Sequence, residues 1–362
     1  MEQGKNFGAK VKALAKRWFI DAFSGMAMGL FATLLIGLII KQLGVLIGDN
    51  AIGNALKTAG AVASALMGAG IGAGIARALK ADKLTLFASI VAGFMGAHAN
   101  GIIDGSFLSN GALVSVAAGE PIGAYVTALV ACEVGLLVQG KTKLDIILVP
   151  LAVISSGLLV VYFICPFVIK LINLISDGIL LATSLQPFLM GIVLSVVVGI
   201  LLTLPTSSAA ICISLKLGGL AGGAAVVGCA AQMIGFAVQS YRENKFAGLI
   251  AQGIGTSMLQ IPNIFKKPIV MLPPVVASAI VGPMATCLFK LECDAAGSGM
   301  GTSGLVGVIS TITASSSLMP TWKLVLAIAL LFFIIPTVVC LVMSEIFRKY
   351  GIYQEGDLKL DL

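Results

Sequence analysis

The chain has 362 residues, of which 58% are hydrophobic and 11% are charged, and its net charge is +7. A soluble domain carries about 25% charged residues, so this composition excludes an ordinary soluble protein and predicts an all-α polytopic membrane protein. The positive charge is typical of basic loops beside a membrane and does not indicate a nucleic-acid partner.

Residues 1–20 are basic and amphipathic, with Lys10 and Arg17 interleaved with Phe7 and Leu14. Such a pattern is typical of a helix that lies on the cytoplasmic face of a lipid bilayer. The segment has no long apolar core, so the sequence gives no indication of a cleavable signal peptide.

Ten apolar stretches near the length that a bilayer requires then follow along the chain. They are residues 22–47, 59–79, 84–101, 121–140, 144–166, 186–205, 219–240, 246–262, 274–290 and 322–347. Two further apolar segments, 102–120 and 295–320, are interrupted by glycines and polar residues. We expect re-entrant or broken helices there, which are tolerated only where protein or water covers the backbone.

The two halves of the chain show similarity at an offset of 162 residues. Met28–Ile40 aligns with Met190–Leu202, and Gly60 falls on Gly222. Five spans in each half would make two inverted repeats, a common plan in transporters. The predicted domains are an N-terminal helix over 1–20, a first repeat over 21–166, a second repeat over 167–347 and a cytoplasmic tail over 348–362.

The distribution of basic residues predicts that both termini are cytoplasmic. With ten spans, Lys143 and Lys267 lie on the cytoplasmic side, whereas Arg242, Asn244 and Lys245 lie outside. Arg242 and Lys245 fit this arrangement poorly, because basic residues favour the cytoplasmic side of a membrane.

Neutral hydrogen-bonding side chains and glycines are concentrated between Gly228 and Asn263. A polar group without a partner in hydrocarbon costs several kcal/mol, so these side chains must face protein, a cavity or a polar solute. Amides suit sugar hydroxyls because they donate and accept hydrogen bonds without the desolvation cost of a charge. We expect a solute site near the bilayer midplane that includes Gln232, Gln252, Thr256, Ser257, Gln260 and Asn263.

The first half offers three further candidate solute contacts, His98, Asn100 and Glu120. His98 is more typical of a hydrogen-bonded interior histidine, and Glu120 is also consistent with an ordinary charge at a helix start. Glu133 lies inside a span and must be paired or neutral. The break at Leu204–Ala210 frees backbone groups at its proline, and is either a structural kink or part of the site.

The sequence contains no recognisable catalytic motif, so an enzymatic role of this chain alone stays open. His98 is the sole histidine, and no metal-spaced Cys/His cluster or phosphate-binding loop is present. The seven cysteines form no CxxC pair and are interpreted as small packing residues. We therefore expect neither a metal nor a cofactor.

Four stretches carry a resemblance to a known family. They are LPTSSAAICISL (204–215), the glutamine-rich run 224–264, GMGTSGLVG (299–307) and GKTKLDIILVPL (140–151). They resemble the perfringolysin-O-regulator-like family of phosphotransferase-system IIC membrane proteins, over nearly the whole chain. The glucose-type permeases carry a Gly-Ile-Thr-Glu element around a substrate glutamate, and here only Gly119-Glu120-Pro121 is similar to it.

The resemblance implies a sugar permease in the bacterial cytoplasmic membrane. Such a subunit moves sugar while a IIB partner, charged by a IIA partner, phosphorylates it at the expense of phosphoenolpyruvate. Permeases of this class are typically homodimers.

Two other functions stay open on the sequence. One is a secondary transporter of another polar solute, driven by protons through Glu120, Glu133 or His98. The other is a membrane sensor that does not transport and passes solute occupancy to a regulatory partner. Uptake that depends on pH and needs no phosphate donor would select the first, and normal signalling without transport would select the second.

Overall fold

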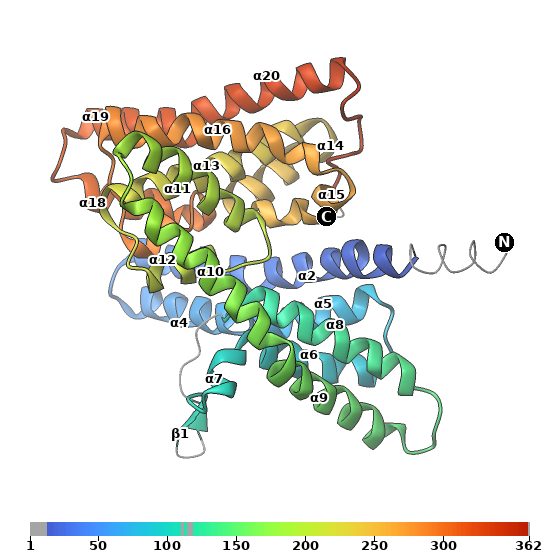
Figure 1. Cartoon of the computed structure of the whole chain (residues 1–362). Helices are drawn as coiled ribbons and strands as arrows, with labels where there is room; N and C mark the ends of the chain where they lie inside the picture. The colour runs from blue at the N-terminus through green and yellow to red at the C-terminus, as the bar shows by residue number, and fades with distance from the viewer. Residues whose placement is uncertain (1–12, 110–111, 114–118, 361–362) are drawn as a thin grey trace. The chain divides into compact units, whose positions relative to one another are not determined.

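The computed structural model describes residues 13–109, 112–113 and 119–360. Apart from β1 (Leu108–Ser109) and β2 (Ala112–Leu113), which pair as a short antiparallel hairpin, the regular structure of this part is helical (Figure 1). Within these described residues, seven helices are long and apolar enough to cross a membrane, or eight if the bent pair α4 (Ala51–Ala65) and α5 (Met67–Ala78) forms one span. The prediction of an all-α polytopic membrane protein is confirmed.

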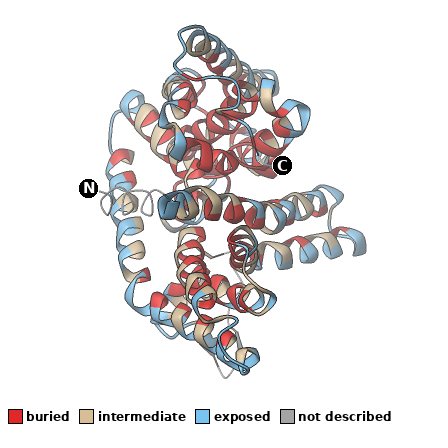
Figure 2. Cartoon of the chain, turned by 90° about the vertical axis from the view of Figure 1, so that its right-hand side faces the viewer, coloured by how far each residue is buried: buried red, intermediate tan, exposed pale blue. Residues whose placement is uncertain are grey.

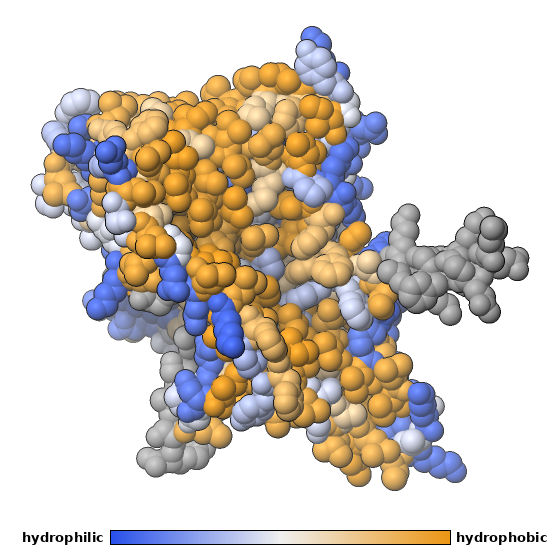
Figure 3. Space-filling model, viewed as in Figure 1, coloured by the Kyte–Doolittle hydropathy of each residue, from blue (hydrophilic) through white to orange (hydrophobic). Residues whose placement is uncertain are grey.

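The chain divides into two compact units. Unit 1 comprises Met1–Gly37 and Thr58–Leu171, and unit 2 comprises Leu38–Lys57 and Ile172–Leu362. Apolar side chains cover much of the drawn face of each unit, as a lipid-facing surface requires (Figure 3). Buried residues are concentrated on the inward faces of the helices within each unit (Figure 2).

The first helical run extends from Ala13 to Ile47. It contains two π-helical turns, and its described N-terminal residues continue directly into the first span. The remainder of the predicted surface helix, residues 1–12, lies outside the described part. The elements of the run are η1 (Arg17–Asp21), α2 (Ala22–Leu30), η2 (Phe31–Leu35) and α3 (Ile36–Ile47).

Unit 1 is a bundle in which neighbouring helices approach at glycines. Gly25 and Gly29 of α2 lie against Gly74 and Gly70 of α5, and these helices are therefore antiparallel. A Cβ at Gly29 would meet the backbone of Gly70, so only glycine permits this approach. The other helices of the unit are α6 (Lys83–Ala97), α7 (Ala99–Ile103), α8 (Pro121–Val138) and α9 (Asp145–Phe163).

The helix α10 (Cys165–Thr183) is a candidate span that the sequence analysis missed. Its Lys170, Asn173 and Asp177 interrupt the apolar pattern, which is why no span was expected there. Its apolar side chains Phe167 and Leu181 are both more than 70% exposed, as they would be in contact with lipid.

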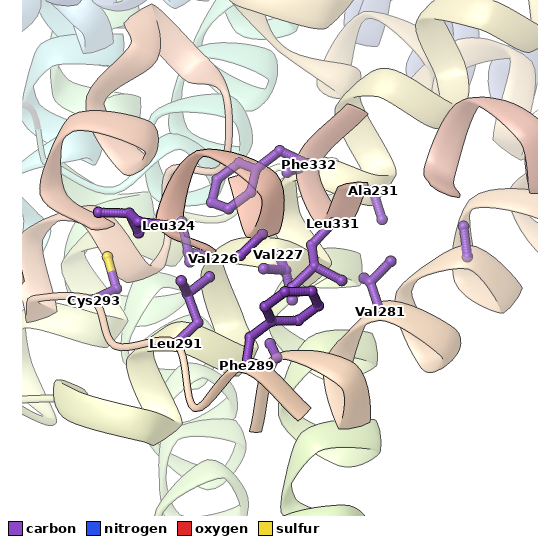
Figure 4. Close-up of a cluster of buried hydrophobic side chains, with 14 of the residues drawn as sticks. Val226, Val227, Ala231, Val281, Phe289, Leu291, Cys293, Leu324, Leu331 and Phe332 are labelled. Atoms are coloured by element: carbon purple, nitrogen blue, oxygen red, sulfur yellow. The ribbon is translucent and has the colours of Figure 1, made fainter. Parts of the chain in front are cut away.

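Unit 2 is built around α13 (Gly219–Gln239), a helix that is buried along most of its length. Its Val226, Val227 and Ala231 lie in the buried apolar cluster drawn in Figure 4, together with Val281 and Phe332. The helices of the unit that follow α10 are α11 (Pro187–Thr203), α12 (Ser208–Ser214), α13, α14 (Tyr241–Ile250), η3 (Ala251–Gly255), η4 (Ser257–Gln260), α15 (Ile261–Lys266), η5 (Pro268–Met271), α16 (Leu272–Pro283), η6 (Met284–Phe289), α17 (Ala295–Ser298), η7 (Ser303–Leu305), α18 (Val306–Ser315), α19 (Thr321–Ile328), η8 (Ala329–Ile334) and α20 (Ile335–Lys349).

The helices α11 and α13 run parallel to each other. Gly228 packs on the backbone of Ser195, while Thr203, farther along α11, bonds Gln232, farther along α13. The segments that the 162-residue alignment matches to them, α2 and α5, are instead antiparallel. That alignment is therefore wrong as a match of helix pairs, because the chain reverses once more between α11 and α13. The inverted-repeat plan stays a prediction without this support.

The predicted span 246–262 is also wrong, because the chain enters and leaves unit 2 at the same end. Asn244 and Asn263 both bond the backbone of the C-terminal segment, at Leu358 and Lys359. Arg242 pairs with Glu345 at this end as well. The placement of Asn244 and Lys267 on opposite sides of the membrane is thus corrected.

Candidate functional site

Three segments of unit 2 turn back inside the bundle, and their tips meet beside the middle of α13. The first turn follows α11. Thr203, the last residue of α11, lies beside Gln232, which is 13 residues into α13 and therefore about 20 Å from its start. The chain must return along this length before α13 begins, and the short helix α12 lies on the way back.

The sequence around Pro205 explains this first turn. The helix α11 ends before the proline, as prolines generally require. The Thr206 hydroxyl donates to Leu201 O at 2.8 Å, and Ser207 caps α12 by accepting from Ala210 N. The break at Leu204–Ala210 is thus a reversal of the chain rather than a simple kink.

The second segment, residues 241–266, enters from the end at which α13 finishes. At its tip, Gly253 O accepts from the Thr302 hydroxyl, and the Ser257 hydroxyl bonds that of Thr203 at 2.8 Å. Extended backbone at Thr256 separates the inward limb from the outward limb, and its side chain caps η4. The return reaches the C-terminal segment at Asn263.

The third segment, residues 293–315, enters from the opposite end. It begins where Cys293 N donates to Gly219 O, and it returns to that end where Ser315 exchanges hydrogen bonds with the backbone of Glu292. At its tip, Gly301 has φ +55° and lies against the backbone of Cys229 and Ala230, a position that glycine alone fills without strain. The re-entrant course expected for 295–320 agrees with this geometry.

The tips and the middle of α13 therefore hold four polar side chains within the apolar bundle, of which three are joined by hydrogen bonds, while Thr302 bonds Gly253 O and the sulfur of Met233, the neighbour of Gln232. They are Thr203, Gln232, Ser257 and Thr302, and all of them are at least 99% buried. Irregular backbone at this depth is tolerated only where protein or a polar solute covers it. Broken segments that converge on one point are the arrangement by which many transporters hold a solute near the midplane.

Gln232 has weakly satisfied hydrogen-bonding groups. Its Oε1 accepts from the Thr203 hydroxyl at 3.4 Å, and its Nε2 donates to the Ser278 hydroxyl at 3.4 Å. Both distances are long for hydrogen bonds, whose usual separation is about 2.9 Å. The amide can therefore exchange these partners for solute hydroxyls at little cost.

Gln252, Gln260 and Asn263 form a separate cluster with well-made bonds. Gln260 Nε2 donates to Gln252 Oε1 at 2.9 Å, and Asn263 Nδ2 donates to Gln260 Oε1 at 2.8 Å. Gln260 and Asn263 also donate to the carbonyls of Leu358 and Lys359. The chain's own C-terminal segment thus occupies the groups that the sequence analysis assigned to a solute.

The three candidates from the first half of the chain lie in unit 1, at the end of α6. His98 is the C-cap of α6, bonds Phe94 O through Nδ1, and contacts the rings of Phe94 and Phe107. Glu120 N donates to Ala97 O, which brings Glu120 back to the same helix end. Asn100 is exposed in α7. Part of the connection, residues 110–111 and 114–118, lies outside the described part.

Glu133 is paired, which settles the alternatives left by the sequence. Arg17 Nε lies 2.7 Å from Glu133 Oε1, and the Trp18 indole donates to the same oxygen at 3.0 Å. Tyr125 of the same helix bonds Trp18 O. The carboxylate therefore anchors the first helical run to α8.

Sequence reasoning missed Thr203, Thr302 and the entire C-terminal segment. The signals were present, since Thr203 directly precedes the Leu-Pro break and Thr302 lies within the Gly-Met-Gly-Thr-Ser-Gly element. The segment Asp357–Leu360 alternates polar and apolar residues, and both of its leucines are buried, although residues 355–358 form turns and no strand.

Comparison with known proteins gives the family. No curated protein matches the chain. The family model described as phosphotransferase system, EIIC, matches residues 20–360, which include most of both units and all three re-entrant segments. The chain accordingly belongs to the EIIC family, the sugar-specific membrane permease components of the phosphotransferase system.

Proposed function

We propose that this permease binds its sugar in unit 2, at the tips of the three re-entrant segments. The observation that carries the proposal is the convergence of Thr203, Gln232, Ser257 and Thr302 inside an apolar bundle. Three hydroxyls and one amide supply both donors and acceptors, which the hydroxyl groups of a sugar require. The absence of a charged side chain from this set suits a neutral solute, because no ion needs to be desolvated.

The lengths of their hydrogen bonds distinguish Gln232 from the cluster that contains Gln252 and Gln260. Gln232 bonds its neighbours at 3.4 Å, whereas Gln252 and Gln260 make bonds of 2.8–3.0 Å that are complete without a solute. Displacing the shorter bonds would leave buried groups unpaired, at about 1–3 kcal/mol for each group. Gln232 is therefore the principal sugar contact in the proposal, and the other two glutamines serve the fold of the second segment.

We infer that the protein lies in the bacterial cytoplasmic membrane and delivers sugar to a separate IIB protein that a IIA protein phosphorylates. The resemblance to the perfringolysin-O-regulator-like group and to dimeric permeases supports a homodimer with a regulatory association. A proton-driven mechanism is less well supported, because Glu133 is held by Arg17 and Trp18.

The test is binding of radiolabelled monosaccharides and hexitols to the purified protein, followed by variants tested with the sugar that binds. Ser257→Ala and Thr302→Val should each weaken binding by roughly ten- to a hundred-fold, because each removes a hydrogen-bonding group from the site. Thr311→Val is the matched control. Its hydroxyl is fully buried but bonds Gly307 O of its own helix, so affinity should stay within about two-fold. Equal losses in all three variants would refute the proposed site.

A further inference from the structure

The C-terminal segment Tyr353–Leu360 is bound to unit 2 as a peptide with two successive turns, in which Asp357 N donates to Gln354 O and Lys359 N donates to Gly356 O. The side-chain amide of Asn244 makes two hydrogen bonds to the backbone of this segment. Its Nδ2 donates to Leu358 O and its Oδ1 accepts from Leu360 N, each at 2.8 Å. Gln260 donates to the same Leu358 carbonyl, and Asn263 donates to that of Lys359. Side-chain amides therefore bind backbone groups of three successive residues, Leu358, Lys359 and Leu360.

The side chains of this segment are held as well. Tyr353 and Leu358 are fully buried and pack in a cluster with Phe236, Ile264 and Val270. An ion pair fixes the polar side, where Lys267 Nζ lies 2.7 Å from Asp357 Oδ2. The amides give the segment its register, while the apolar sites and the lysine select an Asp-Leu-x-Leu sequence.

We propose that Asn244, Gln260, Asn263 and Lys267 form a peptide-binding site whose ligand is the chain's own C-terminal segment, and that this ligand can leave and rebind. Main-chain hydrogen bonds with pockets for alternate side chains are a general mode of peptide recognition. A tethered ligand is present at an effective concentration on the order of millimolar, so a site of moderate affinity stays filled without being permanently closed.

Occupancy of the site controls the second re-entrant segment. Three of the four residues that hold the peptide, Asn244, Gln260 and Asn263, lie on the two limbs of this segment, and its tip carries Gly253 and Ser257. With the peptide bound, the two limbs are joined through the backbone of Leu358. When the peptide leaves, the link through Leu358 is lost while the direct bond between Gln260 and Gln252 remains, so the limbs are held by fewer bonds and the tip becomes more mobile. A change in sugar binding is expected only if the proposed sugar site at this tip is correct. The binding of the peptide does not depend on that proposal.

The experiment separates the segment from the protein after folding. A protease site is inserted at Gly351, an exposed residue with φ +66° at the start of the tail, and the purified protein is cut and washed. A fluorescent peptide of residues 353–360 is then titrated by anisotropy against the cut and the uncut protein. We expect saturable binding to the cut protein and at least hundred-fold weaker binding to the uncut protein, in which the tethered segment competes.

Peptide variants test specificity without altering the protein. The peptide with Leu358→Ala should bind at least ten-fold more weakly, because it loses its buried side chain. The peptide with Asp357→Asn should lose two- to five-fold, since the ion pair is partly exposed. A protein cut in the exposed loop at Gly140 is the control for proteolysis and should bind no peptide. Equal affinity of the parent and Leu358→Ala peptides would overturn the proposal.

Hydrogen exchange gives the second readout, and no sugar is needed for it. Backbone amides of residues 248–260 should exchange at least ten-fold faster after the peptide is washed away, and should slow again when it is added back. Unchanged exchange would show that the peptide does not control the segment. If the cut and washed protein unfolds and peptide does not restore it, the segment is a permanent part of the core and the proposal is wrong.

Discussion

Glu243, in the first turn of α14, and Arg348, in the last turn of α20, form a buried ion pair. Their side chains are 2% and 9% exposed, and Arg348 also lies over the ring of Tyr353. Removing one member leaves the other charge buried without a partner, which typically lowers stability by about 3–5 kcal/mol. Arg348→Met should therefore lower the free energy of unfolding by about this amount, measured by denaturant titration in detergent.

The matched control is the nearby pair of Arg242 and Glu345, whose side chains are 58% and 52% exposed. An exposed pair contributes about 0–1 kcal/mol, so Arg242→Met should be nearly neutral. In the Glu243→Gln background, Arg348→Met should cost less than it does alone, because no unpaired carboxylate remains. Equal effects of the two arginine substitutions would contradict the distinction between buried and exposed pairs.

Asp357 gives the peptide site a defined pH dependence. Burial raises the pKa of Asp357, but hydrogen bonds from Lys267 and Gln354 lower it more strongly, and the resulting pKa is below the ordinary value of 3.8. A carboxyl group with a depressed pKa stabilises the bound state above its unbound pKa, and this contribution is lost as the pH falls through the bound pKa. Binding of the 353–360 peptide should thus be constant from pH 7 to about pH 5 and weaken below about pH 4. Loss of binding between pH 7 and 6 would point to another group.

At the scale of elements, backbone contact between α11 and α13 determines where the site lies. A Cβ at Gly228 would overlap the backbone of Ser195, and neither backbone can move without displacing a helix. Gly228→Ala should cost about 1–3 kcal/mol or more in stability, because it overpacks this contact. The control is Gly178→Ala in α10, where a Cβ meets no neighbouring atom within 4 Å. That substitution should leave stability unchanged or raise it slightly, as measured by thermal unfolding.

The sequence predicted most of the spans because a lipid-facing helix must be apolar along its length. The segment 246–262 satisfied the same pattern for a different reason. Its Ile250 and Leu259 are apolar, yet Gln252 and Gln260 are fully buried and bond each other across two limbs of a turn. Hydropathy measures composition and cannot distinguish one crossing from an entry and a return. Contacts with the C-terminal segment, far away in sequence, determine the outcome.

The candidate site could be predicted only in part. The run that contains Gln232 and Ser257 was identified because neutral amides and hydroxyls are costly in hydrocarbon. Their partners Thr203 and Thr302 come from two other re-entrant segments, and nothing local in the sequence brings them together. Gln252 and Gln260 are of the same residue type, but they bond each other, and Gln260 also bonds the tail. The residue types therefore showed that these side chains need hydrogen-bond partners, but they did not show whether the partner is a solute or another part of the chain.

At the scale of the whole molecule, the course of unit 2 resolves the conflict in the charge distribution. Arg242, Lys267 and Arg348 lie at one end of unit 2, as their ion pairs and the bound tail show. Lys216 and Lys290 adjoin the opposite end, next to Leu217 and Leu291, which contact the start of α13. The more basic end should be cytoplasmic. Arg242 is thus expected on the cytoplasmic side, which agrees with the prediction of a cytoplasmic C terminus.

This orientation predicts a labelling pattern in intact cells. In a background with the exposed Cys287 replaced by serine, cysteines at Arg242 and Lys266 should both resist an impermeant thiol reagent. Cysteines at the exposed positions Lys216 and Lys290 should react. Different behaviour at 242 and 266 would show that the chain crosses the membrane between them and would restore the rejected span.

The location of the sugar is the central claim, and an experimental density map of the protein with bound sugar tests it most directly. The sugar identified by the binding screen should lie within hydrogen-bonding distance of Gln232, Ser257 and Thr302, with its density absent from the map of the sugar-free protein. The two 3.4 Å bonds of Gln232, to Thr203 and to Ser278, should be exchanged for bonds to the sugar. Sugar density beside His98 and Glu120 in unit 1, with the tips of unit 2 unchanged, would contradict the account.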